Sequence, residues 1–139
     1  MNKETSRVGR EADLSSLEYA VLDKLLAGHD PRLRLLREQL EGCRIESREF
    51  TGKGFLTELA VLRPARRTPL DIHAGRLDDV LATIDGLEHG AGFLLYITDG
   101  ELDALEGYSY GEPWPDVIRG FELSYAEGPT RDLRGLEGT

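Results

Sequence analysis

The spacing of apolar residues changes once along this 139-residue chain, at Gly42. Before Gly42, apolar side chains recur every three or four residues, which is typical of helices. After it, they alternate or run together, which is typical of strands. Both helices therefore precede all the strands. Because parallel strands need a long crossover between them, usually a helix, this order favours an α+β fold with a mainly antiparallel sheet.

Both expected helices have clear end signals. The segment Ser15-Ser16-Leu17-Glu18 has the spacing of a capping box, in which a serine hydroxyl and a glutamate carboxylate satisfy early backbone N–H groups. Gly28 is expected to end this helix, Asp30-Pro31 to open the second, and Gly42 to close it. We expect two helices joined by so short a link to pack antiparallel as a helical hairpin.

The segments after Gly42 predict strands separated by turns. The strongest turn signal is Asp99-Gly100, because both residues tolerate positive φ and strand-like segments flank them. Residues 63–75, which contain two prolines, are expected to form a loop. The predicted strands span residues 44–50, 55–62, 80–84, 93–97, 102–105 and 120–125.

Together these segments predict a single domain, with an N-terminal helical hairpin packed on a mainly antiparallel sheet of four to six strands. Its expected bounds are residues 13–126, with flexible tails at residues 1–12 and 127–139. The predicted core consists of Leu17, Val21, Leu25, Leu33, Leu36, Leu40, Phe55, Leu59, Val61, Val80, Ile84, Phe93, Leu95, Ile97, Leu105 and Phe121.

The net negative charge of the chain limits the kinds of partner that it is expected to bind. The formal net charge is −9, so an anionic partner is repelled, and we expect neither nucleic acid nor a membrane as a partner. With Cys43 as the single cysteine, no disulfide within the chain is expected, which fits a reducing compartment. The sequence also shows no apolar run of membrane-spanning length and no signal-peptide pattern, so we expect a cytoplasmic protein.

Three segments carry a resemblance to a known family. They are SREFTGKGF at residues 47–55, GLEHGAGF at residues 86–93 and LEGYSYGEPWP at residues 105–115. Together they resemble a family of small uncharacterised bacterial proteins, and the resemblance covers about residues 14–125. It implies the same fold and a bacterial cytosolic setting, with no activity to carry over. More loosely, the chain is similar to small acidic immunity proteins found beside bacterial toxins.

No strong catalytic or metal-binding motif is present in the sequence. It lacks a P-loop, a GxGxxG after a strand, CxxC, HExxH and GxSxG, so the commonest nucleotide, zinc-protease and hydrolase assignments fall away. A metal site would need His73 and His89 to converge with a carboxylate such as Asp71, Glu88 or Glu106, and the spacing does not require that convergence. We therefore expect no metal, no cofactor and no catalytic residue.

The candidate binding residues cluster near residues 105–115. On a strand, Glu106, Tyr108 and Tyr110 would share one face, and Trp114 follows within a rigid segment of glycine and proline. Tyrosine and tryptophan are over-represented at recognition hot spots. We take these four residues and His89 as the candidate site. The alternative is that Tyr108 and Trp114 only cap the end of the sheet.

These observations lead to three hypotheses of function. We favour a non-enzymatic protein-binding domain of a bacterial cytosolic protein, of the immunity type, because an acidic surface speeds encounter with a basic partner. The first alternative is a small-molecule-binding domain or enzyme whose pocket is formed by His89, Glu106, Tyr108 and Trp114. The second alternative is a homodimeric structural domain that pairs through the aromatic segment or a sheet edge.

Overall fold

The computed structural model describes residues 14–62 and 69–137. In this part of the chain two helices are followed by a seven-stranded antiparallel sheet and a short 3₁₀ helix, so the predicted α+β fold is confirmed. The helices are α1 (Ser16–Leu25) and α2 (Pro31–Glu41), and the strands are β2 (Cys43–Phe50), β3 (Gly54–Val61), β4 (Ala74–Leu77), β5 (Val80–Ile84), β6 (Ala91–Thr98), β7 (Glu101–Ser109) and β8 (Phe121–Tyr125), with η1 at Arg134–Leu136.

The helix ends follow the local signals of the sequence. Ser15 and Glu18 form the complete capping box, and Asp30 caps α2 with Pro31 in its first turn. Gly42 is the C-cap of α2 as predicted, whereas α1 ends at Leu25, shortly before Gly28. Neither helix in the described residues is long and apolar enough to cross a bilayer.

The strands are arranged in the order β2-β3-β7-β6-β5-β8, and β4 also pairs with β6. The turn between β6 and β7 is the predicted Asp99-Gly100 turn, with φ angles of 50° and 80°. Because both residues have positive φ, the turn matches the right-handed twist of the two strands. By contrast, β3 pairs with β7 across a long stretch of chain, and no local signal in the sequence predicts that pairing.

The sheet has one strand more than the upper limit expected from the sequence. The additional strand β4 begins in the last two residues of the predicted loop 63–75 and extends beyond it to Leu77. It pairs with one end of β6, through Leu77 and Leu95, and β5 then pairs with the other end. With four residues and no clear alternation, β4 had too short a pattern to be detected, and its pairing with β6 stabilises it as a strand.

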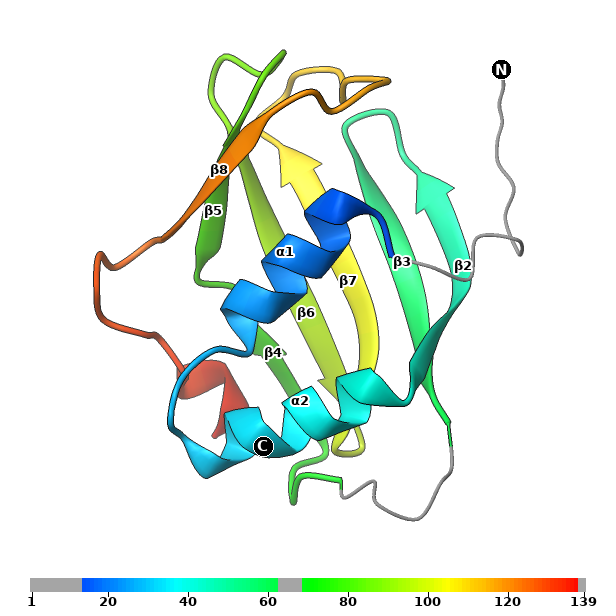
Figure 1. Ribbon diagram of the computed structural model, residues 1–139, viewed down its shortest axis with the longest axis vertical. Coiled ribbons are helices and arrows are strands. Elements are labelled where there is room, and N and C mark those ends of the chain that lie inside the picture. Colours follow the sequence, from blue (N-terminus) through cyan, green and yellow to red (C-terminus); the bar gives the residue numbers. More distant parts are fainter. Residues whose placement is uncertain (1–13, 63–68, 138–139) are drawn as a thin grey trace.

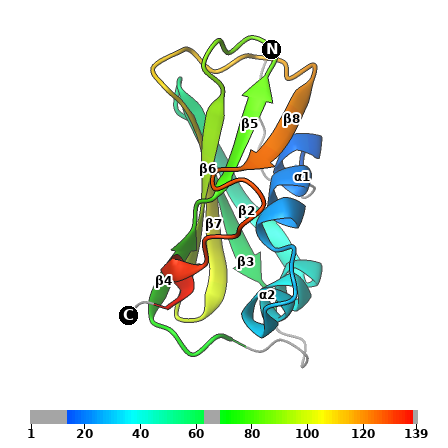
Figure 2. The ribbon, with the colours of Figure 1, turned by 90° about the vertical axis from the view of Figure 1, so that its left-hand side faces the viewer.

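The two α-helices cover the same face of the sheet, and in the described residues neither of them lies on the opposite face (Figure 2). Their axes diverge from the short link between them, so that α1 lies over the upper sheet and α2 over the β6–β7 turn (Figure 1). The α2 side chain of Gln39, which is 1% exposed, donates a hydrogen bond to the carbonyl of Gly100 (3.0 Å) and accepts one from the N–H of Leu102 (2.9 Å). These bonds fix α2 against the turn.

The core lies between the helices and the sheet face that they cover. Most of the predicted core residues are buried there, but Leu40, Val61 and Phe121 are only partly buried. Val61 and Phe121 lie at the ends of strands near the margin of the sheet, where fewer neighbours cover them. Leu136 is 1% exposed and belongs to the core, although the sequence placed it in a loose tail.

The segment after β8 is attached to the domain, contrary to the expectation of a flexible tail from residue 127. Arg131 donates hydrogen bonds to both carboxylate oxygens of the buried Asp79 and to the carbonyls of Leu25 and Ala27. Together with the burial of Leu136, these bonds extend the domain beyond residue 126, to Glu137. The expectation for residues 1–12 lies outside the described residues, as do residues 138–139.

Candidate functional site

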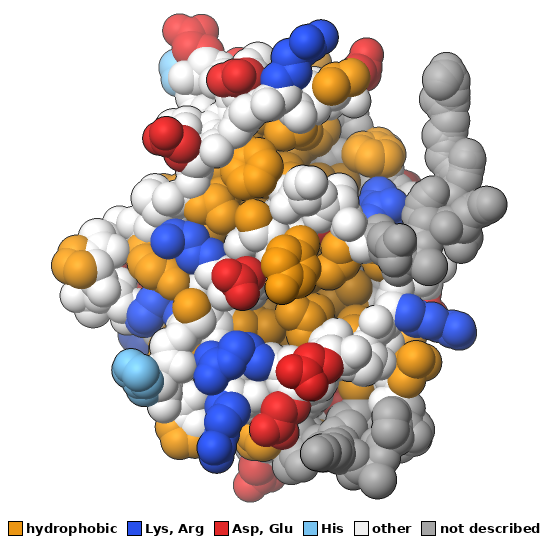
Figure 3. All heavy atoms as spheres, viewed as in Figure 1, with side chains coloured by type: hydrophobic (Ala, Val, Ile, Leu, Met, Phe, Trp, Pro, Cys, Tyr) orange, Lys and Arg blue, Asp and Glu red, His pale blue; other side chains and the backbone are white. Residues whose placement is uncertain are grey.

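The candidate site is a groove on the helix-bearing face, where hydrophobic side chains remain open to solvent (Figure 3). Its volume is about 510 Å³, which lies in the range of small-molecule and peptide sites. The start of α1, strands β2 and β3 and the segment between β7 and β8 enclose it. The groove is lined by Ser15, Ser16, Leu17, Glu18, Arg48, Phe50, Phe55, Trp114, Pro115, Asp116, Ile118 and Phe121.

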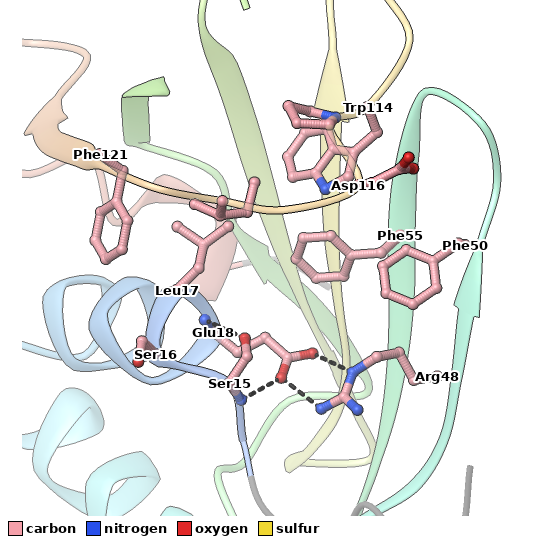
Figure 4. A pocket seen from close by; sticks show the side chains of 12 residues that line it. Ser15, Ser16, Leu17, Glu18, Arg48, Phe50, Phe55, Trp114, Asp116 and Phe121 are labelled. Atoms are coloured by element: carbon pink, nitrogen blue, oxygen red, sulfur yellow. Dashed lines mark hydrogen bonds and ion pairs between the residues drawn. The ribbon is translucent and has the colours of Figure 1, made fainter. Parts of the chain in front are cut away.

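Aromatic rings form one end of the groove. Phe50 and Phe55 face each other across the β2–β3 hairpin, and Trp114 meets Phe55 edge to face, with ring centroids 5.6 Å apart (Figure 4). Phe55 lies over Gly107 of β7, where an added Cβ would come within 2.4 Å of its ring. Phe50 is 65% exposed. The rings thus form a wall that is fixed on the β7 side and open at Phe50.

A buried ion pair forms the other end of the groove. The carboxylate of Glu18, on a residue only 2% exposed, accepts hydrogen bonds from Arg48 Nε (2.9 Å) and Nη2 (2.6 Å). The same carboxylate accepts bonds from the Thr57 hydroxyl and the Ser15 N–H. Burial by itself raises the pKa of the Glu18 carboxyl, but these hydrogen bonds together outweigh it and hold the pKa below its usual value. Glu18 therefore stays ionised, with both carboxylate oxygens occupied by hydrogen bonds.

Asp116 is the remaining charged residue of the lining. It is exposed, and among the described residues no cation pairs with it. Figure 4 shows it beside Trp114, on the part of the groove that also holds Phe50 and Phe55. Because Glu18 and Arg48 neutralise each other, Asp116 gives the lining a net negative charge.

The segment that carries Trp114 and Asp116 is anchored at both sides. The N–H of Trp114 donates to the carbonyl of Gly52 in the β2–β3 turn (2.8 Å). The carboxylate of Glu112 accepts hydrogen bonds from the backbone N–H groups of Glu88 (2.8 Å) and His89 (2.9 Å), which lower its pKa. These bonds hold the segment across the end of the sheet, where its side chains line one side of the groove.

The structure divides the five sequence-predicted site residues among three places. Trp114 lines the groove. Glu106 and Tyr108 lie on the opposite, uncovered face of the sheet. Side chains alternate along β7, and the Phe55 ring packs over Gly107, the residue between them, on the helix side. The side chain of His89 is exposed in the β5–β6 turn, where only its backbone N–H is engaged by the segment before Trp114.

On the uncovered face, Glu106 and Tyr108 share one side of β7, and Tyr110, just beyond the end of the strand, contacts Tyr108. Glu106 accepts a hydrogen bond from the hydroxyl of Tyr96 (2.8 Å). Tyr108 lies over Gly92 of β6 and meets Tyr110 edge to face, with ring centroids 5.6 Å apart. The pKa of Tyr108 is raised to about 12, mainly by burial, so its hydroxyl stays protonated. The four-residue pocket proposed from the sequence, with Trp114 and His89 included, is not assembled.

Most of the groove was not predicted from the sequence. Phe50 and Phe55 flank the predicted 51–54 turn, so their pairing across the hairpin could have been found from the turn alone. Asp116 follows Trp114 closely enough to have been added to the candidate segment. The pairing of Glu18 with Arg48 had no such signal, because thirty residues separate the two side chains.

The described residues contain no cluster of side chains that could bind a metal ion. No group of three or more histidine, cysteine, aspartate or glutamate side chains lies close enough to hold an ion there. His73 pairs instead with Asp99 (2.8 Å), and both side chains are exposed. Burial raises the pKa of the Cys43 thiol to about 11, which leaves little reactive thiolate near neutral pH.

The groove can therefore accept an apolar or aromatic group at its walls and a positive charge beside Asp116. No family model, no curated protein and no solved structure matches this chain. The resemblance to a bacterial family remains an expectation from the sequence.

Proposed function

We propose that this chain is a non-enzymatic protein-binding domain whose basic partner inserts a side chain into the groove on the helix-bearing face. The observation that carries the proposal is an aromatic groove of about 510 Å³ left open on that face, with Phe50 65% exposed at its edge. An exposed phenylalanine beside Trp114 gains most from being covered, because both rings bury large apolar areas.

The charges of the groove favour binding over catalysis. A general acid or base needs a group that can gain or lose a proton near the working pH. The Glu18 carboxylate is held ionised by Arg48, Thr57 and Ser15, all of which occupy its oxygens. The groove therefore offers Asp116 as a charge for pairing and the aromatic rings as contact surface.

The net charge of −9 favours a basic partner, since opposite charges steer encounter and like charges oppose it. The immunity role implied by the loose resemblance is one form of such binding, in which a basic bacterial toxin is the partner.

Site-specific photo-crosslinking tests the proposal in the cells that naturally make the protein. A photoreactive phenylalanine analogue replaces Phe50 in one variant and Tyr19 in another. Tyr19 is a matched control, because it is 58% exposed on α1 but does not line the groove. We expect one basic protein to be captured from position 50 and not from position 19.

Purified proteins then complete the test. The captured partner should bind the wild-type chain and the Tyr19→Ala variant equally, and the Phe50→Ala variant at least about tenfold more weakly, as for an interface hot spot. Equal capture from both positions, or binding that is unaffected by Phe50→Ala, would exclude the groove as the binding surface.

A small-molecule ligand is a second candidate, favoured by the volume of the groove. Of the pocket residues expected from the sequence for this function, only Trp114 contributes. Its fluorescence reports on any ligand, because it is the single tryptophan of the chain. A metabolite that changes this fluorescence with saturation, in a protein that captures no partner, would favour this candidate.

Pairing of two copies is a third candidate, favoured by the uncovered sheet face. Four side chains on this face are only partly buried, and neither α1 nor α2 covers them (Figure 2): Leu56, Leu94, Tyr96 and Tyr108. Sedimentation equilibrium decides this case. A dimer that a Leu94→Glu substitution dissociates would support it, whereas a monomer at all concentrations would exclude it.

A further inference from the structure

We infer that the inserted group is an arginine side chain, stacked against Phe50 and Trp114 next to the buried Phe55, and paired with Asp116. This inference rests on the proposed function, because it names the chemistry of the partner at the same groove.

The charges of the lining favour a cation at one end of the groove. Among the described residues of the lining, Arg48 is the only cation, and its guanidinium is held at Glu18 by bonds of 2.9 and 2.6 Å. Asp116 is therefore left without a cationic partner among the described residues. A positive group from outside would restore the balance.

The aromatic wall is suited to a cation. The faces of aromatic rings carry partial negative charge and attract a positive group within about 6 Å of the ring centroid. Phe50, Phe55 and Trp114 come from β2, β3 and the segment before β8, and they lie together beside Asp116 (Figure 4). An apolar group would use the rings but would leave the Asp116 carboxylate without a partner.

Arginine fits this combination better than lysine. Its guanidinium is planar, so it can stack on a ring while its edge donates two parallel hydrogen bonds to one carboxylate. The more strongly hydrated lysine ammonium cannot make this two-pronged contact.

The protein already contains such an arrangement elsewhere. Arg131 places its guanidinium carbon 4.6 Å from the ring centroid of Tyr125 and donates Nε and Nη2 to the two oxygens of Asp79 (2.8 and 3.1 Å). In this arrangement one arginine contacts an aromatic ring and a carboxylate at the same time. The groove offers the ring and the carboxylate and lacks the arginine.

A matched pair of peptides tests the inference on the purified full chain. The probes are acetyl-Gly-Arg-Gly-amide and the same peptide with citrulline, which keeps the size and planarity of arginine but has no charge. Binding is followed by the fluorescence of Trp114 and by the NMR shift of its indole N–H. We expect the arginine peptide to bind roughly fivefold or more tightly than the citrulline peptide, as for a partly desolvated cation–π contact with a paired carboxylate.

Two variants assign the preference to its residues. Asp116→Asn should reduce the preference for arginine to about twofold or less, without affecting the citrulline peptide, and Phe50→Ala should weaken both peptides. Both positions are exposed, so unchanged circular dichroism and unfolding midpoints serve as the folding control.

Equal binding of the two peptides, or no change at Trp114 with either, would overturn the arginine assignment. A preference for arginine that persists in Asp116→Asn would overturn the role of Asp116. These results leave the proposed function standing if photo-crosslinking from position 50 still captures a partner. Capture that fails while the peptides behave as expected would instead remove the protein partner and keep a site for arginine-like cations.

Discussion

Arg48 of β2 donates two hydrogen bonds, of 2.9 and 2.6 Å, to the carboxylate of Glu18 in the first turn of α1. The same carboxylate completes the capping box with Ser15 and accepts a hydrogen bond from Thr57 of β3. The Glu18 side chain thus joins the start of α1 to the edge strand β2 and to its neighbour β3, at one end of the groove. Because both partners are largely buried, this contact has consequences for stability and for its pH dependence.

Removing one partner of this pair is expected to be costly. Glu18→Ala leaves the Arg48 charge buried without its carboxylate and removes part of the helix cap, so we expect a loss of about 3–5 kcal/mol in the free energy of unfolding. The double variant Glu18→Met, Arg48→Met should lose clearly less, since neither charge remains. Urea denaturation measures both. Equal losses in the two variants would show that the buried charge is not the cause.

The same pair predicts how stability depends on pH. The pKa of Glu18 in the folded protein lies below its ordinary value of 4.5, so Glu18 contributes stability above that value. The contribution decreases as the pH falls below about 4.5 and through the folded pKa. The difference in unfolding free energy between the wild type and Glu18→Gln should therefore be constant from pH 7 to pH 5 and shrink at lower pH. A difference that stays constant to pH 3 would contradict the assignment.

The C-terminal segment provides a matched pair of arginines. Arg131→Ala removes the hydrogen bonds to Asp79, whose side chain is 1% exposed, and we expect a loss of about 3–5 kcal/mol from the uncompensated buried carboxylate. Arg134 pairs with Asp132 at the surface, with its side chain 82% exposed, so Arg134→Ala should leave the unfolding midpoint unchanged. Thermal unfolding compares them. Similar midpoints for both variants would indicate that the segment contributes little to the fold.

Gly107 is expected to be required for the aromatic wall. A Cβ at this position would lie 2.4 Å from the Phe55 ring, so Gly107→Ala must displace that ring from Trp114. We expect a loss of about 1–3 kcal/mol, as for overpacking, together with a shift of the Trp114 fluorescence maximum.

Gly42→Ala is the control for this substitution. Gly42 has a φ of −103°, and the nearest atom to an added Cβ is 4.0 Å away. This variant should keep its fluorescence and lose no stability, because alanine restricts the unfolded chain more than glycine does. Unchanged fluorescence in Gly107→Ala would show that the wall adjusts without moving Trp114.

Local patterns in the sequence were sufficient for the starts of both helices, the end of α2 and the β6–β7 turn. The Ser15–Glu18 capping box, the Asp30 cap and the Asp99-Gly100 turn all form as predicted, because each depends on atoms within a few residues of one another. The order of helices before strands likewise predicted the fold class. The short strand β4 and the attached segment after β8 were missed, since only contacts with distant residues hold them.

The candidate site was likewise predictable only where its residues lie close together in the sequence. Alternation along β7 correctly grouped Glu106 with Tyr108 on one face, but it could not show that the chain then crosses the end of the sheet and places Trp114 on the other face. That crossing depends on the bonds from Trp114 to Gly52 and from Glu112 to the β5–β6 turn, both of which join residues far apart in the sequence.

By itself, the sequence determined the class of the fold, the starts of both helices, the end of α2 and the central hairpin, because short-range hydrogen bonds and hydrophobic periodicity act within one element. Only the tertiary structure decided that Glu18 and Arg48 close one end of a groove, and that Phe50, Phe55, Trp114 and Asp116 form the other. The physical reason is that strand pairing and burial bring these residues together across long stretches of chain, and no local pattern encodes which strands pair.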